Sequence, residues 1–252
     1  MAHWYRTDGS LVDGADLRQA RKEGLIPSVT TILDILDKPG LTQWKMRVGP
    51  DEADRVGAET SAEGARIHDL VSQWLLLYMD GDYQRPLEMP GDDWEVAAQV
   101  AGIVGDDFRL LQPTLEWLQE NISSTHPVMS EVSLTHPAGY AGTVDIACTD
   151  RNGKRLIIDM KTRDIRTAKK KVKRYFEYGM QLGGYEGLVD PAGEESHRWV
   201  SLIINRDAEN PMCVPQEWNK PDKARSRQAF KALLVAWQAI KNFDVRLSLL
   251  DA

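Results

Sequence analysis

Two carboxylates and a lysine fall on neighbouring segments of strand-like sequence. Asp145 lies in the segment 140–149, and Asp159 and Lys161 lie in the segment 154–161, after a turn that contains glycine. Because side chains alternate along a strand, Asp159 and Lys161 must share one face. Two acids and a lysine on one sheet face are costly to bury unless something binds there. A divalent metal ion and a phosphate would both satisfy this arrangement.

The residues suit metal-assisted chemistry on a phosphate. Asp145, Asp159 and the Met160 carbonyl offer oxygen ligands of the kind that Mg²⁺ or Mn²⁺ prefers. Such an ion would acidify a bound water and polarise a phosphoryl oxygen. Lys161 could orient or help deprotonate the attacking water and stabilise the transition state. Taken alone, Asp159-x-Lys161 fits equally well an ordinary ion pair on an edge strand, with Asp145 as a turn residue.

The turn between the two segments decides whether the acids can cooperate. Asn152-Gly153 favours a two-residue hairpin, which would place Asp145 on the face opposite Asp159. A three-residue loop, residues 151–153 with Gly153 left-handed, would instead pair Asp145 with Asp159, because a one-residue slip exchanges the faces. A shared site therefore predicts an odd loop or a bulge.

Four other features are each ordinary when taken alone. His68 lies at the edge of a helical apolar stripe, with Gly64 one turn earlier predicted to leave open space beside its ring. Glu131 begins a strand-like segment. Gln181 and Tyr185 are four residues apart and share a helix face, and the Gly-Gly pair between them indicates close packing.

The fourth feature is a basic segment, residues 161–174, which carries a formal charge of +7 although the whole chain carries −7. Such a segment could contact phosphates or be a solvated helix face. Its basic residues are Lys161, Arg163, Arg166, Lys169, Lys170, Lys171, Lys173 and Arg174.

The elements that must position these residues differ between the two halves of the chain. The first half is helical. Its first helix begins at Ser28 or Thr30 and ends at Pro39-Gly40, and a short helix follows over 41–48. A further helix spans 61–79, and one or two helices span 92–121, with Pro113 as a possible break. The second half reads as strands over 126–134, 140–149, 154–161 and 198–205, with helices over 169–188 and 222–243. The apolar stripe of the last helix, which includes Phe230, Trp237 and Ile240, is expected to seal the core rather than form an interface.

This order predicts an α/β (α+β) fold with a central mixed sheet flanked by helices. We expect one domain over residues 1–252, with a mainly helical part at 27–125, a sheet core at 126–210 and a closing helix at 222–243. No apolar run reaches membrane-spanning length, no signal peptide is evident, and the two cysteines fit reduced thiols, so a cytoplasmic protein without an iron–sulfur cluster is expected.

In this order and spacing, the motifs resemble the PD-(D/E)xK nuclease superfamily. The set is Gly64-x-x-x-His68, Glu131, Gly142-x-x-Asp145, Asp159-x-Lys161-Thr162 and Gln181-x-x-x-Tyr185. Within the superfamily the chain is similar to the RecB-like and mitochondrial genome-maintenance exonuclease group. The segment 28–33, with Trp44 downstream, is similar to stand-alone phage exonucleases. The resemblance covers roughly residues 27–205 and implies a restriction-endonuclease-like core.

The resemblance implies a role for each matched position. Asp145, Asp159, His68 and the Met160 carbonyl would bind Mg²⁺, or Mn²⁺ in its place, and Lys161 would be the catalytic lysine. Glu131 would be an auxiliary catalytic acid. The expected DNA-binding residues, some of which could instead brace the site, are Gln181, Tyr185, Thr162, Arg163, Arg166, Lys169, Lys170, Lys171, Lys173 and Arg174.

The function that follows is a metal-dependent DNA exonuclease acting on DNA ends or single strands, in phage or bacterial recombination, repair or DNA processing. Its partners would be DNA and, as a candidate, a single-strand annealing or binding protein. A phage-encoded protein of this kind would act in the cytoplasm of its bacterial host. The alternatives are a non-catalytic nucleic-acid-binding module of the same fold and a structure-specific endonuclease. A carboxylate-based hydrolase of another class lacks its motifs here. Polarity, strand preference and oligomeric state stay open.

Overall fold

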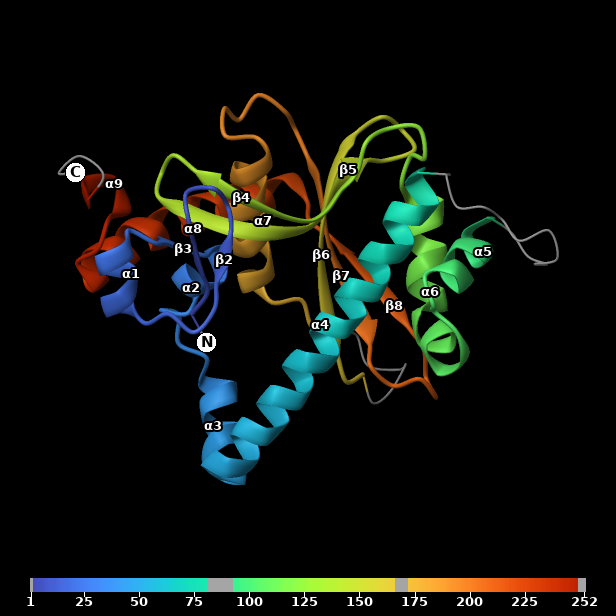
Figure 1. The fold of residues 1–252 in the computed structure, drawn as a ribbon, viewed down its shortest axis with the longest axis horizontal. Coiled ribbons are helices and arrows are strands. Elements are labelled where there is room, and N and C mark those ends of the chain that lie inside the picture. The colour runs from blue at the N-terminus through green and yellow to red at the C-terminus, as the bar shows by residue number, and fades with distance from the viewer. Residues whose placement is uncertain (1, 81–92, 166–171, 249–252) are drawn as a thin grey trace.

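A five-stranded mixed sheet forms the centre of the molecule in the computed structural model, which describes residues 2–80, 93–165 and 172–248 (Figure 1). The strand order is β4-β5-β6-β7-β8, with β6 and β7 parallel and the other neighbours antiparallel. The strands are β4 (Met129–His136), β5 (Tyr140–Thr149), β6 (Arg155–Arg163), β7 (Arg198–Asn205) and β8 (Cys213–Glu217). The predicted α+β class with a central mixed sheet is therefore confirmed.

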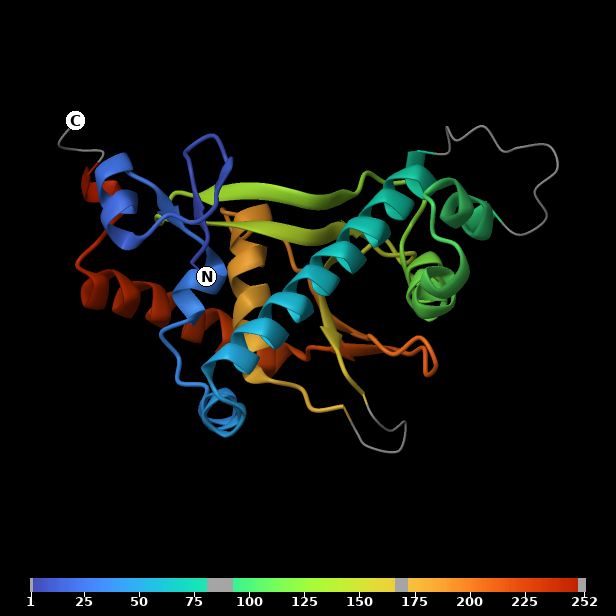
Figure 2. The same ribbon diagram turned by 60° about the horizontal axis from the view of Figure 1, so that its bottom comes forward.

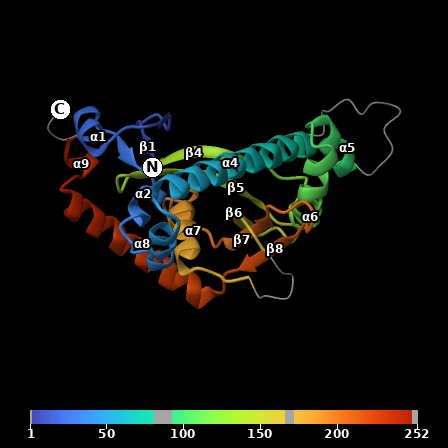
Figure 3. The same ribbon diagram turned by 90° about the horizontal axis from the view of Figure 1, so that it is seen from below.

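Helices cover both faces of this sheet (Figure 3). One apolar core joins Ile158 and Met160 of β6 to α4 (Pro50–Asp80), α5 (Asp93–Val100) and α6 (Gly105–Asn121). A second core joins Ile157 of β6 to α7 (Phe176–Val189) and α8 (Lys220–Lys241). Because side chains alternate along β6, Asp159 and Lys161 lie on the same face as Ile157, which is the face toward α7.

The N-terminal residues form a small separate sheet that the sequence analysis did not predict. It has the order β2-β1-β3 and comprises β1 (Trp4–Tyr5), β2 (Leu11–Val12) and β3 (Ile26–Pro27), with α1 (Leu17–Glu23) inserted. Strands of two residues are too short to show an alternating pattern. Ser28 caps α2 (Val29–Leu33) by accepting from the Thr31 amide, which confirms one of the two predicted helix starts.

Several predicted boundaries in the helical half are wrong. Pro39 does not end a helix but begins α3 (Pro39–Val48), as a proline can because the first helical N–H needs no partner. The next helix, α4, begins at Pro50 rather than near residue 61. Its N-terminal part and α3 stand away from the sheet (Figure 1 and Figure 2). The break between α5 and α6 falls at Gly102, whose φ is +78°, while α6 continues through Pro113.

The helix predicted over 169–188 begins later, at Phe176. Residues 172–175 are not helical, and two of their carbonyls accept hydrogen bonds from side chains of the sheet. Gln216 donates to the Val172 carbonyl, and Arg163 donates to the Lys173 carbonyl at 3.0 Å. Residues 169–171 lie outside the described residues.

The closing helix α8 is confirmed, and Phe230 and Trp237 are buried in the core as expected. Ile240, assigned to the same stripe, is 67% exposed. The last described helix is α9 (Val245–Ser248). No helix within residues 2–80, 93–165 and 172–248 combines the length and apolar character needed to cross a membrane.

Candidate metal centre

The hairpin between β5 and β6 has the three-residue loop that a shared site requires. The Asp150 amide donates to the Lys154 carbonyl at 2.7 Å, and Gly153 is left-handed with φ of +77°. The ladder pairs Ile146 with Ile158. Continuing that register by one residue sets Asp145 opposite Asp159, so the prediction of a common face is confirmed and the two-residue hairpin is excluded.

The sheet divides where these two acids lie. The pairing of β5 with β6 ends at Ile146 and Ile158; beyond it β5 continues beside β4, and β6 continues beside β7. Figure 1 shows β4 and β5 running away from β6 and β7 at this point. The Asp145 carboxylate accepts the Met160 amide at 2.7 Å, which replaces the missing ladder bond. A buried acid therefore lies at the branch point of the sheet.

Asp159 is completely buried and only half satisfied. Its Oδ1 accepts from Lys161 Nζ at 2.7 Å, but its Oδ2 has no hydrogen-bond partner within the described part of the chain. Burial raises the pKa of Asp159 to about 6, and Asp145 adds to the rise while Lys161 opposes it. An orphaned buried carboxylate oxygen is unfavourable, and a cation bound at the site would satisfy it.

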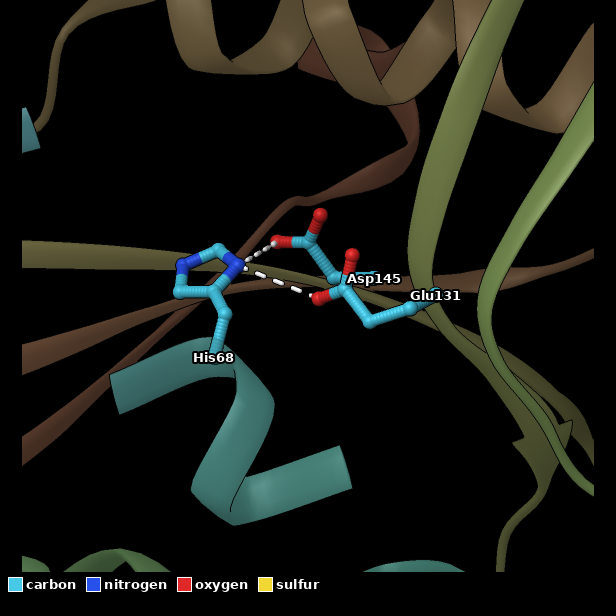
Figure 4. Close-up of side chains that lie close together, drawn as sticks. All are labelled: His68, Glu131 and Asp145. Atoms are coloured by element: carbon cyan, nitrogen blue, oxygen red, sulfur yellow. Dashed lines mark hydrogen bonds and ion pairs between the residues drawn. The ribbon is translucent and has the colours of Figure 1, made fainter. Parts of the chain in front are cut away.

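A second group of ligand atoms converges at the same branch point (Figure 4). His68 Nδ1 lies 3.2 Å from Glu131 Oε1 and 3.8 Å from Asp145 Oδ2. The ligand atoms of these three residues all lie within 4.8 Å of one another, which is close enough to hold one metal ion. His68 comes from α4, Glu131 from β4 and Asp145 from β5, so three separate elements build the group.

Glu131 adopts an unusual backbone conformation to take part. Its φ is 52°, and it falls between the regular pairs Ser130–Ile146 and Val132–Val144. A left-handed conformation is uncommon for a residue with a side chain, and such local strain tends to occur where function requires it. No motif in the sequence marks this conformation. The structure brings Glu131 into the group of three side chains that could hold a metal ion, and its predicted role as an auxiliary acid stays a prediction.

The charges of the group are strongly coupled. Burial lowers the pKa of His68, but Asp145 and Glu131 outweigh burial and leave the pKa raised. Burial raises the pKa of Asp145, while His68 and Lys161 oppose the rise. A proton on the imidazole thus partly neutralises the acids, as a divalent cation would do more completely. The donor set of one imidazole and carboxylates fits Mn²⁺ or Mg²⁺.

A pocket of about 640 Å³ opens onto this group. It is lined by Lys161, by the three side chains that could hold a metal ion and by two buried side chains of α7, Gln181 and Tyr185. Gln181 Nε2 donates to the Tyr185 hydroxyl at 2.8 Å, so the predicted pair acts as one unit at the pocket wall. The volume falls in the range of ordinary ligand sites.

Three hydroxyl-bearing residues of the pocket lining were not predicted. They are Tyr5, Ser133 and Thr143, and the Thr143 hydroxyl lies 2.9 Å from each of the other two. Tyr5 belongs to the small N-terminal sheet, so only the three-dimensional structure brings it to the pocket. Hydroxyl groups of this kind can bind phosphate or sugar oxygens, and no motif in the sequence marks them.

Close packing by glycines supports the site from behind. A Cβ at Gly184 would lie 2.9 Å from Val29, and one at Gly183 would lie 3.3 Å from the Arg227 backbone, as the Gly-Gly pair predicted. The expectation of open space at Gly64 is wrong, because a Cβ there would lie 3.2 Å from Thr162 Oγ1. Gly64 instead lets α4 approach β6, and Thr162 lies on the strand face opposite Lys161.

The remaining predicted residues are outside the pocket. Arg163, the last residue of β6, and Lys173 lie next to the Tyr175 ring. Arg174 donates to Asp222 at 2.6 Å and to the Glu217 carbonyl, so hydrogen bonds within the chain already engage its guanidinium group. Arg166, Lys169, Lys170 and Lys171 lie outside the described residues. The proposed role of the Met160 carbonyl stays a prediction.

Comparison with known proteins identifies no family for the chain. No protein-family model matches it, and no curated protein matches it. Among solved structures it is similar to one described as "Crystal structure of SSO0001", with 19% sequence identity and a TM-score of 0.29 over 68% of this chain and 74% of the other. A likeness at that level carries no functional argument, so the function is argued from the site.

Proposed function

We propose that this protein is a metal-dependent deoxyribonuclease of the PD-(D/E)xK type, hydrolysing phosphodiester bonds at DNA ends or in single strands. One observation carries the proposal. The branch point of the sheet brings His68, Glu131 and Asp145 together beside Asp159 and Lys161. These residues are up to 93 positions apart in the sequence. Each motif is weak alone, and their common location supports one site to which all of them contribute.

A divalent cation would be held by His68, Glu131 and Asp145, and the unpaired oxygen of Asp159 lies in the same charged cluster. When bound, the ion would supply an acidified water and would offset negative charge on a phosphoryl oxygen. The chain itself supplies the burial that keeps the acids in place. Asp145 is anchored through the Met160 amide, so its carboxylate has a defined orientation.

Lys161 supplies positive charge at the reacting phosphate. Burial lowers the pKa of Lys161, but Asp159 and Asp145 outweigh this effect and raise it, which favours the ammonium form. Of the two roles predicted for this lysine, orientation of the attacking water and stabilisation of developing negative charge are therefore favoured over proton abstraction. Its bond to Asp159 holds Nζ at the pocket edge.

A digestion series on end-labelled DNA tests the proposal. Single-stranded, blunt, overhanging and circular substrates are incubated with Mg²⁺ or Mn²⁺ and with the variants Asp145→Asn and Lys161→Ala. We expect wild-type cleavage of linear DNA that depends on the metal, and loss of cleavage in both variants. Asp106→Asn, which alters an 82% exposed side chain on α6, is the matched control and should keep full activity.

The outcomes separate the competing functions. Cleavage of circular DNA would favour a structure-specific endonuclease over an exonuclease. DNA binding without cleavage on any substrate would favour a non-catalytic binding module. Wild-type turnover in either variant would reject the proposed mechanism, because the site would then not perform the reaction.

A further inference from the structure

A cluster of exposed aromatic and basic side chains continues the site beyond the end of β6. Arg163 lies two residues after Lys161 on the same face of the strand, about 7 Å farther along. The Arg163 guanidinium lies 4.9 Å from the centre of the Tyr175 ring, and Lys173 Nζ lies 4.8 Å from it. Phe176 follows at the first position of α7. We call this set the aromatic–basic track: Arg163, Lys173, Tyr175 and Phe176.

The track is physically continuous with the metal centre. Lys161 Nζ lies 5.5 Å from the centre of the Tyr178 ring, and that ring packs edge-on against Tyr175 with centroids 5.4 Å apart. A ligand that reaches Lys161 would therefore have the track as its next contact.

The rings of the track are presented to solvent. Phe176 is 44% exposed and Tyr175 is 36% exposed. Within the described residues, Phe176 makes no contact with another aromatic ring, whereas Tyr175 is engaged by Arg163 and Lys173. A solvent-exposed phenylalanine contributes little to folding, and its free ring face can stack on a flat ligand.

The charge of the track is also uncompensated. Arg163 and Lys173 form no ion pair with any carboxylate within residues 2–80, 93–165 and 172–248. The three nearby acids are already bound elsewhere: Glu177 pairs with Lys38, Asp164 with Arg206, and Asp222 with Arg174. On a chain with a net charge of −7, this local excess of positive charge favours an anionic polymer.

We propose that the aromatic–basic track binds the unpaired nucleotides of a single-stranded DNA segment that enters the site at Lys161. This inference rests on the proposed nuclease function and adds its strand preference. Two basic groups gathered at Tyr175, with the exposed ring of Phe176 next to it in the chain, match a polymer that offers both phosphates and bases. In a duplex the faces of the bases are stacked on each other, so the Phe176 ring would find no partner there. The track therefore selects single strands.

Fluorescence anisotropy without added divalent metal tests the track independently of cleavage. The probes are a fluorescein-labelled oligothymidylate of about 20 nucleotides, which exceeds the footprint of one binding fold, and a duplex of equal length. We expect Phe176→Leu to weaken binding of the single strand about tenfold, the effect of one lost base stack, and to change duplex binding less than about twofold. Arg163→Gln should lower the slope of log binding constant against log salt concentration by about one, the value for one phosphate contact.

Matched controls and the cleavage assay make the result decisive. Val235→Ala removes a 65% exposed apolar side chain on α8, Lys22→Gln removes an exposed charge on α1, and both should bind like wild type. Thermal melting checks that Phe176→Leu is folded. Equal losses of affinity for single strand and duplex, or no loss of affinity in Phe176→Leu, would overturn the proposed role of the track even if the wild type cleaves DNA. Binding that depends on Phe176 without any cleavage would instead uphold the track and reject the nuclease function.

Discussion

Two buried acids, Asp159 of β6 and Glu186 of α7, have surroundings that differ sharply. Asp159 has a single donor, Lys161, and one oxygen without a partner in the described part of the chain. Glu186 receives two N–H groups of Arg227 and the indole N–H of Trp199, the latter at 3.0 Å. Both carboxylates are shielded from solvent, with exposures of 0% and 7%.

The protonation of the two acids reflects this difference. Burial raises the pKa of Asp159 to about 6, whereas for Glu186 burial is outweighed by its hydrogen bonds with Arg227 and its pKa falls to about 2. A fully bonded buried acid stabilises the fold, while a half-bonded one leaves binding capacity for something else. The comparison supports the proposal that the branch point binds a ligand, whereas the bonds of Glu186 are all made within the chain.

The largest expected effect is on catalysis. Asp145→Asn should reduce cleavage at least about a thousandfold, because it removes a metal ligand that the transition state requires. The Tm should stay unchanged or rise, since a buried acid with a raised pKa is replaced by a neutral group. Digestion assays and calorimetry on the same sample check both parts. A large fall in Tm with the same loss of activity would show that Asp145 is structural, like Glu186.

The next effect is stabilisation by metal. At a concentration about a hundred times its Kd, Mn²⁺ should stabilise the wild type by about 2.7 kcal/mol, which corresponds to a rise in Tm of roughly 5–10 °C for a chain of this size. Asp145→Asn should lose this rise, while Glu186→Gln should keep it. Differential scanning calorimetry with and without Mn²⁺ measures the shift. An equal rise in all three proteins would place the ion elsewhere.

Glu186→Gln should lower the free energy of unfolding by about 2 kcal/mol, since Arg227 loses its charged partner but remains partly solvated. Turnover per folded molecule should not change, because Glu186 does not line the pocket at the branch point. Urea denaturation and the digestion assay measure the two quantities. Loss of activity with unchanged stability would reverse the assignment of the two clusters.

The smallest effect is the opposite pH dependence of the two acids without metal. The raised pKa of Asp159 gives a stability contribution that is fully present below its unfolded pKa and is lost as pH rises through about 6. The lowered pKa of Glu186 gives a contribution present above its unfolded pKa and lost as pH falls toward about 2.

Asp159→Asn should therefore remove the loss of stability that accompanies a rise in pH from the unfolded pKa of an aspartate to about 6. Glu186→Gln should remove the loss that accompanies a fall in pH from the unfolded pKa of a glutamate toward about 2. Urea denaturation over a series of pH values checks both slopes. Parallel profiles for the two variants would show that the acids have equivalent environments.

Much of the central sheet could be predicted from the sequence. The segments 140–149 and 198–205 coincide with β5 and β7, because buried strands have strong and continuous apolar patterns. The common face of Asp145 and Asp159 followed from the register once a three-residue loop was assumed. The helical half was predicted less well, because α3 and the first half of α4 are largely exposed and carry weak patterns.

The sequence by itself determined the order of the chemical groups, the alternation that puts Asp159 and Lys161 on one face, and the concentration of positive charge after them. Only the tertiary structure decided which groups share a site. The division of the sheet at Asp145, the left-handed Glu131 and the position of Tyr5 depend on contacts between distant segments. The physical reason is that local patterns set the direction of a side chain within its own strand or helix, whereas long-range packing sets which elements meet.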